Sequence, residues 1–369
     1  MLADPIAGLR SPTGALVSVY LNRPSPGGFS ALVTDTLRPL RERIDHLPRN
    51  VQKSLRRDSR KIRGLADRLE MEPAPSFAVF ASDEDDIFVV ESLTHEIESR
   101  ATLGPRPYLR PLRVAPRPLR AGVLVADRTE ARIFTSSGEH LEEVGTALKT
   151  DIGKPNFGGF SGYQEHSTRS HADEASARIW REAAARLLDA HQDRALDFLV
   201  IGSLEEMADE IVGQLHPYLA DLDRRSLPSL PGDVTLGGLR PKLADLTADV
   251  RARRQMALVD QVLDTARAGG QAVLGLENAI EAANVLAVGT LVVAGWFTRT
   301  GVVCGSCGAI GRAGASCAVC GEKTLPVDDV VSELMDAVVA AGGTVHQVAI
   351  PSQLDNHGVG ALTRYPVQV

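Results

Sequence analysis

The four cysteines of the sequence form two Cys-x-x-Cys pairs, Cys304 with Cys307 and Cys317 with Cys320, separated by nine residues. Each pair can turn two thiolates toward one ion, and two pairs supply the four ligands of a tetrahedral structural zinc site. Two disulfides or four unrelated thiols are the alternatives, but the chain has no other cysteine and no recognisable secretory signal. The spacing therefore predicts a zinc ribbon over residues 301–324. It indicates little about function, because zinc ribbons serve many proteins as small structural modules.

A second group of chemically active residues is a dense run of cations near residue 60. Its members are Lys53, Arg56, Arg57, Arg60, Lys61 and Arg63. Four of them recur at three- or four-residue spacing, which places them on one face of a helix. Such a face can contact the phosphates of RNA, whereas a solvated helix surface beside Asp58 and Asp67 is the plainer alternative. We expect this face to bind RNA.

A third group lies in and just after the Gly-rich segment 151–165, before a long helix expected from about His166 to His191. Its candidate RNA-binding residues are Lys154, Phe157, Phe160, Gly162, Tyr163, Gln164 and His166. Aromatic rings stack on unpaired bases and a lysine meets phosphate, so we expect this tip loop to dock on ribosomal RNA or tRNA. A surface lid without chemistry is the alternative.

Length and charge limit the classes of protein that fit. A chain of 369 residues has room for two or three domains. The net charge of −7 excludes a chain coated throughout for nucleic acid, but residues 1–120 hold 19 Lys and Arg against 15 Asp and Glu. No apolar run reaches the length of a membrane span. We therefore expect a cytoplasmic protein with no membrane partner and a basic N-terminal module.

The elements that must position these residues alternate between strand and helix in three blocks. The first block, 1–117, has an apolar strand near Ala15–Leu21, two helical stretches and a hairpin over 76–90. It ends in a Pro-rich segment, 105–118, which we expect to be an extended connector. The second block, 118–252, contains the tip loop, and the third, 253–369, contains the zinc ribbon. The pattern predicts an α/β multi-domain fold.

Three features carry a resemblance to a known family. The ending His357–Tyr365 resembles the glycine-rich close of the archaeal and eukaryotic class-one peptide-chain release factors and of Pelota. The stretch from Gln255 to Val293 looks like the start of the C-terminal domain of that family, in which archaeal members carry an inserted zinc ribbon. The segment Gly158–His166 lies where release factors place their Gly-Gly-Gln loop. Among bacterial relatives, the chain looks most like the Balon-type ribosome-hibernation factors.

The resemblance implies three α/β modules in release factor/Pelota order. The N-terminal module would lie at the decoding centre of the ribosome and the tip loop at the peptidyl transferase centre, near a P-site tRNA. The C-terminal module, with its zinc ribbon and structural Zn²⁺, would face a translational GTPase such as elongation factor Tu. Ribosomal RNA is the main partner that this arrangement implies.

Two departures from the family pattern shape the expected activity. The nearest match to Gly-Gly-Gln is Gly162-Tyr163-Gln164, and the side chain of Tyr163 disfavours the positive φ that glycine allows. The region 47–63 lacks the Asn-Ile-Lys-Ser motif that reads stop codons. We therefore expect a factor without catalytic residues that occupies the A site of idle or stalled ribosomes and reads no stop codon. The alternatives are a peptidyl-tRNA hydrolase in which Gln164 orients the water, and a ribosome-independent RNA-binding stress protein.

Overall fold

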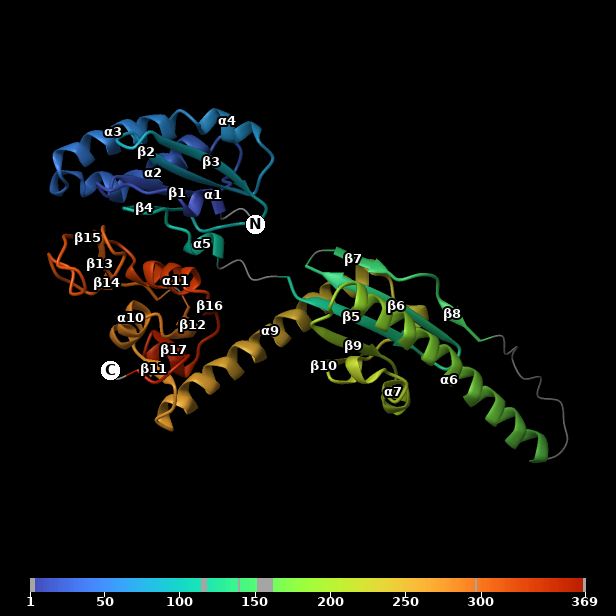
Figure 1. The fold of residues 1–369 in the computed structure, drawn as a ribbon. Helices are drawn as coiled ribbons and strands as arrows, with labels where there is room; N and C mark the ends of the chain where they lie inside the picture. The colour runs from blue at the N-terminus through green and yellow to red at the C-terminus, as the bar shows by residue number, and fades with distance from the viewer. Residues whose placement is uncertain (1–3, 114–117, 139, 151–161, 296, 368–369) are drawn as a thin grey trace. The chain divides into compact units, whose positions relative to one another are not determined.

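The computed structural model describes residues 4–113, 118–138, 140–150, 162–295 and 297–367 (Figure 1). The chain divides into two compact units, one formed by Met1–Ala115 with Gln255–Val369 and the other by Pro116–Arg254. The domain limits expected after residues 117 and 252 lie two residues from the limits of these units. None of the helices in the described part of the chain has the length and apolar character needed to cross a membrane.

The N-terminal part of the first unit is a four-stranded antiparallel sheet in the order β3-β2-β1-β4. The strands are β1 (Leu16–Asn22), β2 (Ser76–Ser82), β3 (Ile87–Leu93) and β4 (Arg100–Gly104). The helices are α1 (Asp4–Ala7), α2 (Phe29–Glu42), η1 (Ile44–His46), α3 (Arg49–Arg63) and α4 (Ala66–Met71). Alternate residues of β1 point to opposite faces, so that Val17 and Val19 pack under α2 and α3 while Tyr20 packs on the other side (Figure 1).

Helix α3 has the amphipathic pattern that the sequence suggests. Val51, Leu55 and Ile62 are buried against the sheet, and the cationic residues lie on the opposite face. The helix begins after Pro48 and ends at Gly64. Because its apolar stripe fixes its rotation on the sheet, the direction in which the basic residues point is also fixed.

The described part of the Pro-rich segment, residues 105–113, is not the extended connector that its prolines predict. It contains the short helix α5 (Arg110–Arg113), and Tyr108 and Leu109 are buried under the N-terminal sheet. The fully buried guanidinium of Arg110 donates to Asp329 Oδ2 at 2.9 Å and to the carbonyl of Phe297 at 2.7 Å. The hydroxyl of Tyr108 donates to the same carboxylate at 3.0 Å. Buried polar partners therefore outweigh the local preference of the prolines and join the segment to the C-terminal part of its unit.

The C-terminal part is a second four-stranded sheet, in the order β11-β17-β12-β16. Its strands are β11 (Ala272–Leu274), β12 (Val288–Ala294), β16 (Thr344–Val348) and β17 (Val359–Thr363), and its helices are α10 (Leu276–Asn284), α11 (Val330–Ala340) and η3 (Gln353–Asn356). Strands β12 and β16 are parallel, and β17 runs antiparallel to β12. Helices α10 and α11 pack on one face through Ile280, Leu334 and Val338. Asp329 caps α11 by accepting from the backbone N–H groups of Val331 and Ser332.

The second unit is a mixed sheet with helices on both faces. Its strands follow the order β10-β9-β5-β6-β7, with β8 paired to β6. They are β5 (Arg120–Ala126), β6 (Glu130–Ser137), β7 (His140–Glu143), β8 (Leu148–Lys149), β9 (Phe198–Gly202) and β10 (Asp223–Leu227). The helices are α6 (Gly162–Asp193), α7 (Glu205–Val212), α8 (Pro217–Ala220), η2 (Pro231–Asp233) and the first part of α9 (Leu236–Arg267), which continues into the first unit from Gln255. Ile179 and Leu187 of α6 pack on one face, and Leu239 and Val250 of α9 pack on the other.

Glycines do not delay the start of two helices. Helix α9 starts at Leu236, although Gly237 and Gly238 follow directly. Helix α6 starts at Gly162 rather than near His166, so the last residues of the expected tip loop 151–165 belong to its first turn. In both places one or two glycines are not enough to stop a helix that is anchored further along by packing.

Candidate nucleic-acid interface and metal centre

The four cysteines converge as their spacing predicts. They lie on a three-stranded ribbon of β13 (Gly301–Cys304), β14 (Ile310–Gly311) and β15 (Thr324–Val327), between β12 and α11. The four sulfur atoms lie within 4.8 Å of one another, with Cys304 and Cys320 3.5 Å apart and Cys307 and Cys317 3.6 Å apart. Sulfurs about 2.3 Å from one tetrahedral ion would lie about 3.8 Å from each other. A disulfide would need about 2.05 Å, so the two-disulfide alternative is wrong and the thiols are free.

Backbone donors surround the sulfurs. The N–H of Cys307 donates to Cys304 Sγ and lowers the pKa of this thiol to about 6. The N–H of Cys320 likewise lowers the pKa of Cys317. The N–H of Glu322 lowers the pKa of Cys320, but hydrogen bonds with the other sulfurs outweigh it and raise this pKa to about 12. Four sulfurs this close share protons, and the donor set fits a thiophilic divalent ion.

The ribbon is fastened to the C-terminal sheet domain rather than hanging from it. Val303 and Ile310 belong to the same apolar core as α10 and α11. The side-chain amide of Asn284 brackets Ile310, donating to its carbonyl at 2.8 Å and accepting from its N–H at 2.9 Å. The metal centre is thereby held on a packed scaffold.

The basic face predicted on α3 exists, but its members differ in their surroundings. Lys53, Arg56 and Arg60 are exposed. Arg57 and Lys61 instead both hydrogen-bond Asp83, at 2.7 and 2.9 Å, and these contacts lower the pKa of the Asp83 carboxyl. Arg57 and Lys61 are exposed as well, but they are paired with a carboxylate of their own fold. The contact of the six cations with RNA stays a prediction.

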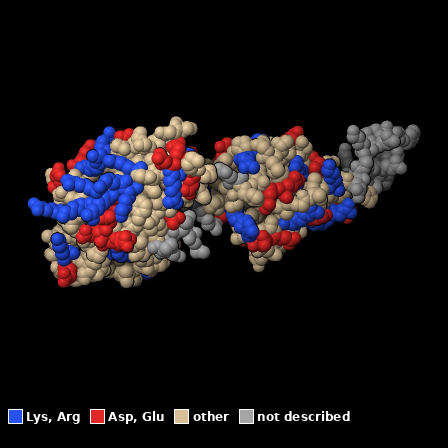
Figure 2. Space-filling model, turned by 90° about the horizontal axis from the view of Figure 1, so that it is seen from above, with Lys and Arg blue, Asp and Glu red and all other residues tan. Residues whose placement is uncertain are grey.

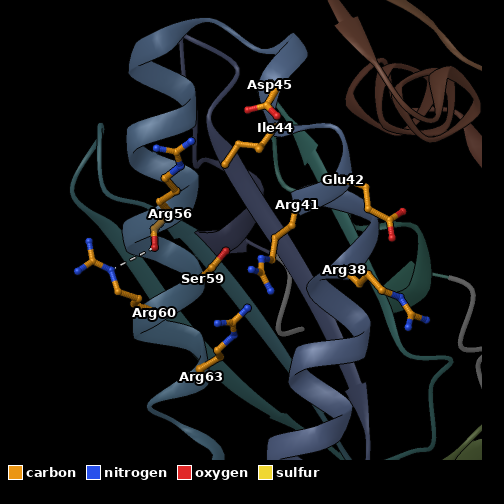
Figure 3. A pocket seen from close by; sticks show the side chains of 9 residues that line it. All are labelled: Arg38, Arg41, Glu42, Ile44, Asp45, Arg56, Ser59, Arg60 and Arg63. Atoms are coloured by element: carbon orange, nitrogen blue, oxygen red, sulfur yellow. Dashed lines mark hydrogen bonds between the residues drawn. The ribbon is translucent and has the colours of Figure 1, made fainter.

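Helices α2 and α3 enclose a hollow of about 690 Å³ that the sequence alone did not indicate. We call it the arginine hollow; it is lined by Arg38, Arg41, Glu42, Ile44, Asp45, Arg56, Ser59, Arg60 and Arg63 (Figure 3). Lys and Arg gather densely on the molecular face over α2 and α3 (Figure 2). Arg38 and Arg41 were missed because their three-residue spacing on α2 becomes informative only once α2 is known to lie beside α3.

The floor of the arginine hollow contains polar groups without partners. Within the described residues, Nε and Nη2 of Arg63 are buried and make no hydrogen bond, and neither does the buried Oγ of Ser59. These two residues are one helical turn apart on α3 and so share a face. Arg60 donates through Nε to the carbonyl of Arg56 at 3.4 Å, which leaves its terminal nitrogens available (Figure 3).

The described part of the structure does not include the side chains of the tip-loop candidates. Lys154, Phe157 and Phe160 lie outside the described residues. Gly162, Tyr163, Gln164 and His166 lie in the first turns of α6, and their side chains are outside the described part of the structure. Their expected contact with RNA stays a prediction.

Residues 107–235 match a family model of release factor-like domains. The family is described as bacterial archaeo-eukaryotic release factor family 10. The match covers β5 to β10 with α6, and it confirms the resemblance to the release factor and Pelota superfamily that the sequence predicted. No curated protein matches the chain.

The chain also matches solved structures, all at low identity and with TM-scores below 0.5. An archaeal translation termination factor, aRF1, is 16% identical, with 99% of this chain and 96% of that chain covered and a TM-score of 0.26. A ribosome-bound archaeal Pelota with ABCE1 is 17% identical, with 79% and 78% covered and a TM-score of 0.44. Dom34 of S. cerevisiae, a translation termination-like factor, is 12% identical, with 79% and 80% covered and a TM-score of 0.39. The resemblance to release factors therefore rests on the family model and not on these solved structures.

Proposed function

We propose that the protein is a ribosome-associated translation factor that occupies the A site of idle or stalled ribosomes, as the hibernation factor Balon does, without reading stop codons. The observation that carries this proposal is the arginine-rich face of α2 and α3 in a chain whose middle segment is release factor-like. A cationic face on one module and a release factor-like module beside it in sequence suit a protein that contacts RNA at more than one place. Its affinity would come from many phosphate contacts, and its effect from steric exclusion of tRNA and other factors.

We further propose that the protein is not an enzyme. In the family, hydrolysis depends on glycines that adopt backbone angles forbidden to other residues, and Tyr163 stands where one of these glycines is needed. Tyr163 lies in the helix that begins at Gly162, and tyrosine forms helix more readily than glycine. This helical backbone supports a role for the segment other than hydrolysis. The segment then serves for docking near the peptidyl transferase centre and the P-site tRNA.

The partners of the other modules follow from the same proposal. The N-terminal module would contact ribosomal RNA at the decoding centre. The C-terminal module would face a translational GTPase such as elongation factor Tu, with its ribbon stabilised by Zn²⁺ bound to the four cysteines.

Two measurements on the full chain test the proposal. Sedimentation with vacant bacterial ribosomes should carry the protein into the ribosome pellet. Ribosomes with a labelled peptidyl-tRNA in the P site should release peptide no faster with the protein than in buffer. Release that disappears in a Gln164→Ala variant would establish the hydrolase instead. Binding to free RNA without binding to ribosomes would establish the RNA-binding stress protein.

A further inference from the structure

The arginine hollow concentrates positive charge that the fold does not neutralise. Five guanidinium groups line it, from two neighbouring helices, against the carboxylates of Glu42 and Asp45. Within the described residues, all of these arginines except Arg38 are without an ion pair, and Arg38 reaches only Asp35 at 3.5 Å on the exposed surface. Like charges held side by side repel each other, so this arrangement favours the binding of an anion.

Arg63 is the residue that distinguishes this hollow from an ordinary basic surface. It is partly buried, and its Nε and Nη2 are shielded from solvent without a hydrogen-bond partner in the described structure. The hydroxyl of Ser59, only 5% exposed as a residue, is in the same condition one turn away. Buried donors without acceptors cost stability, and the two residues that carry them both line the hollow. A ligand that offers several acceptor oxygens at the floor of the hollow would satisfy them.

We propose that the arginine hollow is a binding site for a phosphate group of an RNA backbone. Arg63 and Ser59 donate to the phosphate oxygens from the floor, and Arg41, Arg56 and Arg60 donate from the walls. The planar guanidinium presents two parallel N–H groups that match two phosphate oxygens, which a lysine does not.

The surroundings of the hollow favour a chain of phosphates over an isolated anion. Lys53 lies on the same helix outside the hollow and is exposed, so the cationic surface continues beyond the space that one phosphate fills. A backbone that runs over α3 would place one phosphate in the hollow and others along the helix. The proposal rests on the proposed function in one respect, namely that the RNA is ribosomal.

The test compares two substitutions on the same helix. Arg63→Met removes the floor donor, and Arg57→Met removes the same charge at a position paired with Asp83 and outside the hollow. Binding of the full chain to a labelled single-stranded RNA oligonucleotide is measured by fluorescence anisotropy over a range of salt. Arg63→Met should weaken binding about tenfold or more, because it removes hydrogen bonds to a charged group. It should also reduce the slope of log K against log salt by about one, whereas Arg57→Met should change both far less.

Competition identifies the ligand class. Inorganic phosphate and pyrophosphate should displace the oligonucleotide from the native protein and have little effect on the residual binding of Arg63→Met. A nucleoside triphosphate that binds as tightly as the oligonucleotide would overturn the assignment to an RNA backbone. Equal affinities of Arg63→Met and Arg57→Met would overturn the site itself.

The proposed function and this site can fail separately. If the native protein binds the oligonucleotide through Arg63 but does not sediment with ribosomes, the site stands and the ribosomal function falls. If the native protein and Arg63→Met both sediment with ribosomes and bind the oligonucleotide equally, the function stands and the site falls. Thermal unfolding of Arg63→Met is the control for misfolding. The variant should be at least as stable as the native protein, because it loses only donors without partners.

Discussion

Glu333 is a buried acid whose protonation should make the stability of the first unit depend on pH. It lies on α11 with its side chain 10% exposed, and its Oε2 is 3.5 Å from Nη1 of Arg106. That oxygen has no hydrogen bond within the described residues. Burial raises the pKa of Glu333 to about 7 despite the attraction of Arg106.

The sign of the effect follows from which state holds the proton. Between the ordinary pKa of 4.5 and about 7, the folded protein keeps a proton that the unfolded chain has released. Stability conferred by this proton is therefore lost as the pH rises through that window, and the total loss is about 3 kcal/mol. Above about pH 7 the folded protein holds an ionised carboxylate in a poorly solvated place.

The substitution Glu333→Gln keeps the shape of the side chain and removes its titration. The variant should match the native protein near pH 5 and exceed its stability near pH 8 by about 1–3 kcal/mol. For a unit of this size each kcal/mol corresponds to about 2–4 °C in Tm. Scanning calorimetry of both proteins at several pH values, with zinc present throughout, measures the difference in their stability. The other titrating groups are the same in both proteins, so their contributions cancel in this difference. Glu281→Gln, an exposed position on α10, is the control for the loss of one charge. A difference between Glu333→Gln and the native protein that does not change with pH would refute the reasoning.

Two further predictions concern buried contacts and the metal. Asp329→Ala removes both the cap of α11 and the partner of Arg110, and should destabilise the first unit by about 3–5 kcal/mol in urea unfolding. Adding Arg110→Met should recover part of this loss. Strictly additive effects of the two substitutions would contradict the buried pair. Cys304→Ser should reduce zinc content, measured by mass spectrometry, and speed amide exchange in β13–β15 while leaving β5 and β9 protected. Full zinc occupancy in that variant would contradict the four-cysteine site.

The parts of the site that the sequence predicted are those set by local spacing. Two Cys-x-x-Cys pairs meet because a turn and a short ribbon suffice to bring them together. The basic face of α3 follows from a helical repeat over fifteen residues, whose apolar members Val51, Leu55 and Ile62 fix the opposite side. Neither inference needs knowledge of how distant segments pack.

The parts that the sequence could not predict depend on contacts between distant segments. Arg57 and Lys61 pair with Asp83, which comes from the turn after β2. Arg41 lines the arginine hollow because α2 packs beside α3. The prolines of the Pro-rich segment predict an extended connector, because each of them disfavours helix and central strand. Arg110 in this segment is nevertheless held by Asp329, more than two hundred residues away.

Two other arginines of the N-terminal module that are shielded from solvent have partners within the fold. Arg23 donates to the carbonyls of Ala74 and Leu69 and lies over the ring of Phe29 at 5.3 Å. Arg110 is buried and paired with a carboxylate. A fold that supplies partners for these cations leaves Arg63 without one among the described residues, although a methionine would fill the same space at lower cost. Local rules are broken where function requires it, so the gain that offsets the cost of Arg63 should come from a ligand outside the folded chain.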